Sequence, residues 1–331
     1  LSIPAAIGAE YLKVPLAWFL GPMLITSIIS LSGVKLKMPR LVLSSVLILL
    51  GLYIGNYIDK SLFSQINDWV WTSLIMFFYI ILSVIIVSKY LQKFSGYDKK
   101  TSIFSAAPGA LGPLLILAED ENSDLSRVAT SHLIRLIIII TVFPFLVNSF
   151  YGSEISQTVQ ENYEAQSLTS LIILIICSII LIIFFEKIRV PAALLSGTLV
   201  ASGILQISEI ASYKLPLNII DYCLLILGSS VGCRFADKTF SEIAKNALHS
   251  FVATFLLVVL GLTAALFASF VIDKNFFTLL LSYCPGGIYE VAVIAIFFDL
   301  DPEFVSFHHI IRLLMILFIV PIILNIFHRK T

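Results

Sequence analysis

Long apolar runs, separated by short polar or charged stretches, follow one another along the whole chain. A helix needs about 20 apolar residues to cross the hydrocarbon core of a bilayer. By this measure the first half is predicted to contain helices over Leu1–Tyr11, Pro15–Leu31, Leu41–Ile58, Trp69–Tyr90, Thr101–Ala118 and Asp124–Ser149. The second half is predicted to contain them over Leu168–Phe185, Pro191–Ile207, Pro216–Phe235, Leu248–Val271, Phe276–Phe298 and Pro302–Phe327. The stretch between the halves is polar and acidic without apolar periodicity, which indicates an exposed linker.

The two halves share a motif that contains Pro, Gly, His and Arg at the same spacing. The first copy comprises Ala107-Pro108-Gly109-Ala110, His132, Arg135 and Pro144, and the second Cys284-Pro285-Gly286-Gly287, His309, Arg312 and Pro321. Adding 177 to each number of the first copy gives the second, and Asp124 and Asp301 follow the same rule. An internal match of this length indicates a duplicated architecture. We therefore expect a first membrane repeat over residues 1–150, a polar linker over 151–166 and a second membrane repeat over 167–331.

Paired glycines extend this duplication beyond the motif. Gly51 and Gly55 correspond to Gly228 and Gly232 at the same offset. This GxxxG spacing lets two helices approach closely, so we interpret these glycines as packing positions.

Whether the two halves are parallel or inverted depends on the segment Thr101–Ala118. If it crosses the membrane fully, each half has six spans and the halves are parallel; if it dips in and returns, each has five and they are inverted. The Lys and Arg residues near the span ends, which favour the cytoplasm, barely separate the two cases. The interpretation we prefer is an all-α, polytopic membrane protein of two inverted repeats. It would have about 10 transmembrane helices and one broken or re-entrant Pro-Gly segment per repeat.

Composition supports a membrane protein and excludes a typical soluble domain. Of the 331 residues, 59% are hydrophobic and only 13% charged, and the mean hydropathy is +1.00. Soluble domains are about 45–50% apolar and about 25% charged. The net charge is zero, which gives no indication of nucleic-acid binding, and the four cysteines have no metal-ligand or disulfide spacing. The chain begins with Leu1 inside an apolar run, so we expect residues to precede it, and we do not interpret Leu1–Ala9 as a signal peptide.

The Pro-Gly segments are the first candidate site. Proline removes a backbone donor and glycine permits unusual conformations, so Pro108 with Gly109, and Pro285 with Gly286 and Gly287, are expected to interrupt their helices. Transporters use paired interruptions of this kind to bind substrate, often directing the positive N-terminus of a half-helix at an anion. The alternative is a kink that serves packing only.

Two His-x-x-Arg pairs are the second candidate site. His132 with Arg135, and His309 with Arg312, lie three residues apart and therefore on one helix face within apolar spans. Ionisable residues in such spans usually face the interior, a cavity or a partner. Arginine suits carboxylate or phosphate, and histidine can exchange protons near neutral pH. The alternative is that each arginine caps helix carbonyls or pairs with Asp124 or Asp301.

Glu290 distinguishes the second copy from the first, because Pro113 occupies the matching position. A buried carboxylate either pairs with a cation, such as one of the arginines, or takes up a proton. His308, opposite Ser131, is a second asymmetry. We therefore expect the working site to lie mainly in the second half.

These motifs resemble the AbrB-type duplicated membrane proteins, which were once described as ammonia monooxygenases and are now usually treated as transporters or regulators. The resemblance covers almost the whole chain, and its most specific part is Pro285-Gly286-Gly287-Ile288-Tyr289-Glu290 with Arg312. Ala110 and Pro113 depart from this pattern in the first half. The resemblance implies the duplicated architecture and names no substrate.

Three function classes follow from these features. The preferred one is a non-enzymatic secondary transporter of the bacterial inner membrane, which moves a small anionic solute by alternating access. Proton coupling and homo-oligomer formation are left open, and no cofactor, metal or nucleic acid is expected. The second class is a membrane-embedded regulator that binds a ligand without moving it. The third, a metal-dependent oxygenase, would need clustered ligands, whereas the five histidines are scattered.

Overall fold

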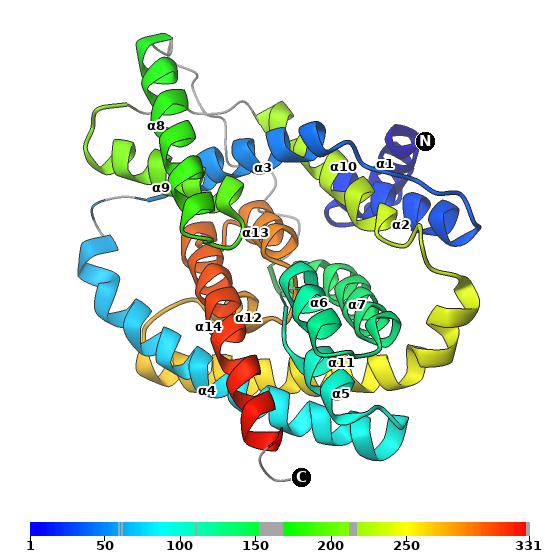
Figure 1. Cartoon of the computed structure of the whole chain (residues 1–331). Coiled ribbons are helices and arrows are strands. Elements are labelled where there is room, and N and C mark those ends of the chain that lie inside the picture. The colour runs from blue at the N-terminus through cyan, green and yellow to red at the C-terminus, as the bar shows by residue number, and fades with distance from the viewer. Residues whose placement is uncertain (59, 61, 110, 152–167, 212–216, 329–331) are drawn as a thin grey trace. The chain divides into compact units, whose positions relative to one another are not determined.

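The computed structural model describes residues 1–58, 60, 62–109, 111–151, 168–211 and 217–328 (Figure 1). This part of the chain forms fourteen helices and no strand, which confirms the all-α prediction. In the first half they are α1 (Ser2–Tyr11), α2 (Ala17–Leu31), α3 (Arg40–Gly55), α4 (Leu62–Ser95), α5 (Lys99–Ala106), α6 (Leu111–Asp120) and α7 (Leu125–Tyr151). In the second they are α8 (Leu168–Lys187), α9 (Ala193–Ile207), α10 (Leu217–Cys233), α11 (Phe240–Val271), α12 (Phe276–Tyr283), α13 (Ile288–Phe297) and α14 (Pro302–His328). All but one residue of the predicted linker, 151–166, lies outside the described residues.

Helix boundaries in the two halves repeat with the spacing of the sequence motif. Adding 177 to both ends of α5, α6 and α7 gives both ends of α12, α13 and α14. The same shift takes the start of α3 to the start of α10. Local structure therefore follows the spacing that the Pro-Gly and His-x-x-Arg motifs display.

Five helices in the described part of the chain are long and apolar enough to cross a membrane: α4, α7, α8, α11 and α14. Five further apolar helices are shorter, with 10–17 residues each. Together with the composition, these helices define a membrane protein. The predicted number of about ten crossings stays a prediction, because the short helices do not reach the usual spanning length of about 20 residues.

Two long helices extend further than the apolar pattern predicted. Helix α11 begins eight residues before Leu248, because Thr239 and Glu242 form a capping box at its start. The Thr239 side chain accepts a hydrogen bond from the Glu242 backbone, and Glu242 accepts one from the Thr239 backbone. Helix α4 likewise has polar residues at both ends. Hydropathy identified the apolar middle of α4, and for α11 it gave the correct end at Val271 but missed the start.

The chain forms two compact units, and each contains segments from both halves of the sequence. Unit 1 consists of Leu1–Ile66, Pro144–Lys238 and Ala292–Glu303. Unit 2 consists of Asn67–Phe143, Thr239–Val291 and Phe304–Thr331. Both Pro-Gly motifs and both His-x-x-Arg pairs therefore belong to unit 2.

Unit 1 is held together by helix pairs that meet at the paired glycines. Helix α3 packs against α9, and α10 packs against α2. A Cβ atom at Gly51 would overlap the Thr198 hydroxyl and lie 2.5 Å from the Leu195 carbonyl oxygen. At Gly228 it would overlap the Phe19 carbonyl. The interpretation of the GxxxG positions as close-packing sites is confirmed.

Unit 2 contains α4 and α11, which pack against one another (Figure 1). Val87 and Leu91 of α4 form a buried cluster with Ala253 and Leu257 of α11. Further along α11, the absence of a side chain at Gly261 brings the helix close to the end of α12, since a Cβ there would lie 2.9 Å from the Tyr283 carbonyl oxygen. These contacts position α4 and α11 beside one of the interrupted helices.

Replacement of Gly51 by alanine should destabilise the protein by about 1–3 kcal/mol, because the added methyl group has no space between α3 and α9. The measurement is the thermal unfolding temperature of the detergent-purified protein. Gly8→Ala is the matched control, since a Cβ at this helical position of α1 meets nothing within 4 Å. Equal unfolding temperatures for the two variants would show that the α3–α9 contact is looser than described.

Candidate functional site

Each Pro-Gly motif interrupts a helix within unit 2. Helix α5 ends at Ala106, Ala107 is extended (φ −62°, ψ 127°), and α6 begins at Leu111. The same arrangement follows α12, where Cys284 is extended (φ −59°, ψ 132°) before α13 begins. A residue that precedes proline is driven out of the helical conformation, and proline has no N–H to continue the helix. The predicted helix breaks are confirmed at both motifs.

The short helices before the breaks have defined starts as well as defined ends. The Asp98 side chain accepts a hydrogen bond from the Thr101 backbone N–H (3.0 Å) and caps α5. The Asn275 side chain accepts one from Phe277 N–H (2.8 Å) and caps α12. Asp and Asn are favoured at such positions because their side chains satisfy the free N–H groups of the first turn. Each half-helix is therefore an element of eight residues with two fixed ends.

The first His-x-x-Arg pair, on α7, binds the C-terminal end of α5. His132 Nε2 lies 3.0 Å from the Phe104 carbonyl oxygen. Arg135 Nη1 donates to the Ala107 carbonyl (3.0 Å), and its Nη2 lies 2.6 Å from His132 Nδ1. The pair thus supplies hydrogen-bond donors to carbonyls that the interrupted helix leaves without intrahelical partners.

The second pair, on α14, binds the end of α12 in the same way. His309 Nε2 lies 2.9 Å from the Leu281 carbonyl oxygen. Arg312 donates through Nη1 to the Cys284 carbonyl and through Nη2 to the Gly286 carbonyl (2.6 Å). Arg312 Nη2 also lies 3.1 Å from His309 Nδ1. The sequence-based alternative that the arginines cap carbonyls is therefore realised at both breaks, and the carbonyls belong to a neighbouring half-helix.

These contacts determine where the proton of each histidine lies. A guanidinium only donates hydrogen bonds and a backbone carbonyl only accepts them. His132 and His309 must therefore accept at Nδ1 from the arginine and donate at Nε2 to the carbonyl. Both are neutral imidazoles in this arrangement. A second proton would place an N–H against an arginine N–H.

The two arginines are buried and their contacts leave their charges without a counterion. Arg135 is 3% exposed and Arg312 is 0% exposed. No ion pair joins either arginine to a carboxylate among the described residues; Asp124, one of the two carboxylates considered as alternative partners beside Asp301, pairs with Arg127 at 3.3 Å. The negative ends of the half-helix dipoles partly compensate the two charges.

Residues from both motifs meet at Arg312. A Cβ atom on Gly109 would lie 2.9 Å from Arg312 Nη2 and 3.3 Å from its Nε. Gly109 has φ +116°, a conformation that side-chain-bearing residues rarely adopt. The guanidinium of the second copy therefore lies against the helix break of the first.

Glu290 lies in the first turn of α13 and bends back over Gly287. It is 2% exposed, and a Cβ atom on Gly287 would overlap its Oε2 and lie 2.8 Å from its Cδ. A carboxylate here complements the positive N-terminal end of α13. Helix α6 has no acidic residue in its first turn. The two copies therefore differ in the helix that follows each break: α13 has an acidic residue in its first turn and α6 has none.

His308 has contacts of a different kind from the two His-x-x-Arg pairs. Its Nδ1 lies 2.8 Å from the Phe304 carbonyl oxygen, and its Nε2 lies 2.8 Å from the Thr72 hydroxyl on α4. Phe304 and Trp69 lie beside its ring. These contacts join α14 to α4 and involve neither arginine.

Sequence analysis missed Tyr79 and Ser83, which lie one turn apart on α4. Tyr79 is 4% exposed, and its ring packs edge-on against Tyr283 at the end of α12. The two hydroxyls are near enough to interact with each other, and within the described residues Arg312 Nε has no hydrogen-bond partner. The sequence feature that could have identified Tyr79 is its phenol group inside an apolar span, at a position where the second half has Leu256.

Comparisons with known proteins identify the family of the chain. The model of the AbrB family, described as transition state regulatory protein AbrB, matches residues 18–328, and the chain belongs to that family. The chain is 22% identical over 325 residues to "Putative regulator AbrB" of Escherichia coli (strain K12), covering 98% of this chain and 93% of that protein. It is also 22% identical over 303 residues to "Uncharacterized protein YhjN" of Bacillus subtilis (strain 168), covering 85% and 77%. No solved structure gives a significant match.

Replacement of Gly109 by alanine should lower the stability of unit 2 by about 1–3 kcal/mol. The reason is that alanine at φ +116° is strained and its methyl group would displace the Arg312 guanidinium. Gly112→Ala is the control three residues away, because a Cβ there meets nothing within 4 Å and alanine favours a helix. Thermal unfolding in detergent measures both variants. A Gly109→Ala protein as stable as the control would contradict the described geometry of the break.

Proposed function

We propose that this protein is a multi-pass transporter of the bacterial inner membrane that moves a small anionic solute by alternating access. The observation that carries the proposal is the pair of buried guanidiniums at the two helix breaks, which have carbonyl and histidine partners but no carboxylate in the described part of unit 2. Pro108, Gly109, His132 and Arg135 would form one side of the binding site. Pro285, Gly286, Gly287, Glu290, His309 and Arg312 would form the other.

The physical reason is electrostatic. Removing a charged group from water costs several kcal/mol, and carbonyl dipoles return only part of that cost. A unit charge about 4 Å from another is worth about 4 kcal/mol at an effective dielectric constant of about 20. An anion between Arg135 and Arg312 would interact with both, which offsets the cost of its own dehydration. A cation would meet two like charges.

The architecture supports transport because each half of the chain contains an interrupted helix, so that two related structural changes could open the same site to opposite sides of the membrane. Repeated halves with an interrupted helix in each are a feature of secondary transporters, whose binding sites lie at the interrupted segments. Helix ends that recur with a shift of 177, and half-helices braced by the same His-x-x-Arg geometry, fit a duplicated chain. We propose that the halves are inverted repeats, since inversion lets the same structural change face opposite sides of the membrane.

For proton coupling, the hydrogen bonds favour Glu290 over the histidines. His132 and His309 have both ring nitrogens engaged as neutral imidazoles. Protonating either one would break its bond to the neighbouring arginine. The Glu290 carboxylate lies over Gly287 at the start of α13 and takes no part in these four hydrogen bonds. Any coupling proton would therefore be carried by Glu290.

Replacement of Arg312 by glutamine should lower uptake of small carboxylates into proteoliposomes by at least about thirtyfold, because one buried charge partner of the anion is lost. Arg312→Lys keeps the charge but loses the planar fork, so uptake should fall less. The control is Arg127→Gln, since Arg127 forms an exposed pair with Asp124 that contributes about 0–1 kcal/mol. Unchanged uptake by a folded Arg312→Gln protein would refute anion binding at this site.

An imposed pH gradient should change the uptake rate of the unmodified protein and have little effect on Glu290→Gln, because glutamine cannot exchange a proton. Counterflow of labelled against unlabelled solute, without a gradient, is the accompanying measurement and should be retained in the variant. A gradient that leaves the unmodified protein unaffected would argue against coupling to protons.

One observation favours a second function. The relative from Escherichia coli is named as a regulator, and a regulator could use the same buried site to bind a ligand without moving it. Equilibrium binding of carboxylates to the purified protein, combined with an absence of both uptake and counterflow in proteoliposomes, would identify this function.

A further inference from the structure

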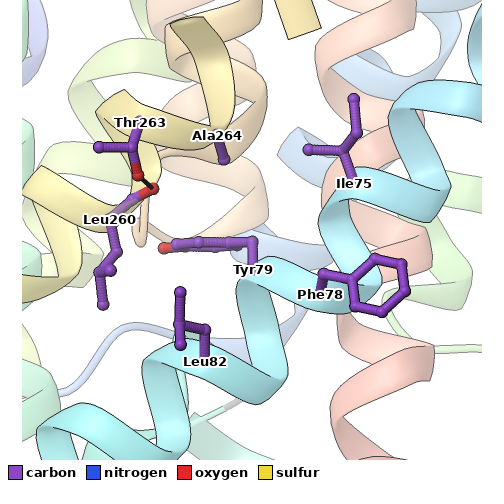
Figure 2. Close-up of a pocket in the computed structure, with 7 residues that line it drawn as sticks. All are labelled: Ile75, Phe78, Tyr79, Leu82, Leu260, Thr263 and Ala264. Carbon is purple, nitrogen blue, oxygen red and sulfur yellow. Dashed lines mark hydrogen bonds between the residues drawn. The ribbon is translucent and has the colours of Figure 1, made fainter. Parts of the chain in front are cut away.

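A groove lies between α4 and α11 within unit 2. Its volume is about 170 Å³, and it is lined by Ile75, Phe78, Tyr79, Leu82, Leu260, Thr263 and Ala264. Figure 2 shows Tyr79 extending from α4 across the space between the two helices. The Thr263 hydroxyl donates to the Leu260 carbonyl of its own helix (2.8 Å), so Tyr79 supplies the polar group of this groove.

Tyr79 links this apolar groove to the end of α12, where the Cys284 carbonyl accepts a hydrogen bond from Arg312. Its ring forms part of the groove wall, while its hydroxyl is buried. The ring also packs edge-on against Tyr283, the last residue of α12 (centroids 6.1 Å apart). Gly261 keeps α11 close here, since a Cβ on it would lie 3.6 Å from the Tyr79 hydroxyl.

Nε of Arg312 is a buried donor that lacks an acceptor among the described residues, whereas the hydroxyls of Tyr79 and Ser83, one turn apart on α4, are near enough to interact with each other. Buried donors in native proteins almost always have a partner, so the free guanidinium N–H indicates a ligand that brings an acceptor atom. A carboxylate has two oxygens that accept only and carries the charge that complements the arginines. The remainder of such a ligand would face the apolar groove.

We propose that the groove is the apolar subsite of the anion site, and that the preferred ligand is a monocarboxylic acid with one ring or a short branched alkyl group. The inference rests on the proposed function in that the carboxylate is placed at Arg135 and Arg312. An apolar cavity of about 150 Å³ accommodates benzene, so a groove of about 170 Å³ accepts a ring of that size. Tyr79 contacts both parts of the ligand: its hydroxyl the carboxylate, its ring the apolar group.

This geometry also defines which acids are disfavoured. Acetate fills the carboxylate position but leaves the groove unused. Succinate would place a second carboxylate against Leu82, Leu260 and Ala264, where no donor compensates the loss of water. One methylene in an apolar pocket changes discrimination by about 10–200-fold, so we expect benzoate and cyclohexanecarboxylate to bind at least tenfold more tightly than acetate or succinate.

The test is equilibrium binding of radiolabelled benzoate to the full chain in lipid nanodiscs, with unlabelled acids as competitors. Thr263→Trp fills the groove and should weaken benzoate binding at least tenfold while leaving the affinity for acetate unchanged. Leu262→Trp is the matched control, because Leu262 is an exposed neighbour on α11 outside the groove. Tyr79→Phe keeps the ring and removes the hydroxyl, so it should weaken all carboxylates alike.

Each outcome separates this inference from the proposed function. Equal binding of acetate and benzoate, or equal effects of Thr263→Trp and Leu262→Trp, would overturn the groove and leave the anion site standing. Equal effects of Thr263→Trp and Leu262→Trp would mean that lipid chains alone occupy the groove. Failure of every carboxylate to bind would overturn both proposals. Tight benzoate binding that depends on the groove, without uptake into proteoliposomes, would support the subsite and overturn transport.

Discussion

The binding of a guanidinium to the carbonyls of an interrupted helix is the interaction on which the candidate site depends. A helix that stops inside an apolar unit leaves C-terminal carbonyls without partners, and an arginine buried there lacks a counterion. Hydrogen bonds between the two satisfy the carbonyls and partly compensate the charge of the arginine: Arg135 donates to the Ala107 carbonyl, and Arg312 donates to the Cys284 and Gly286 carbonyls. Dipoles compensate a full charge incompletely, and our proposal that the breaks bind an anion rests on this incomplete compensation.

Differences between two otherwise matching copies supply the specific chemistry. The brace of His, Arg and carbonyl is the same in both, but Glu290 covers the start of α13 where the first copy has Pro113. Tyr79 likewise places a phenol group on α4, where the second half has Leu256. We propose that these single differences decide where a proton or an apolar group is accommodated on an otherwise matching framework.

The interrupted helices and the glycine contacts could be predicted because proline, glycine and apolar periodicity act locally. A residue before proline leaves the helical region whatever surrounds it, and a GxxxG face permits close packing with any suitable neighbour. The start of α11 was predicted too late, because a capping box rather than hydropathy determines it. Whether the arginines would cap carbonyls or pair with Asp124 remained open, since local spacing places both alternatives within reach.

By itself, the sequence determined the helical class, the membrane character, the positions of both helix breaks and the residue types at the site. These follow from composition, backbone stereochemistry and the 177-residue spacing, which need no knowledge of distant contacts. Only the tertiary structure decided that Arg312 lies against Gly109, that α3 pairs with α9, and that Tyr79 packs against Tyr283 at the end of α12. The reason is that each of these contacts joins residues more than a hundred positions apart. Such contacts depend on how whole helices pack.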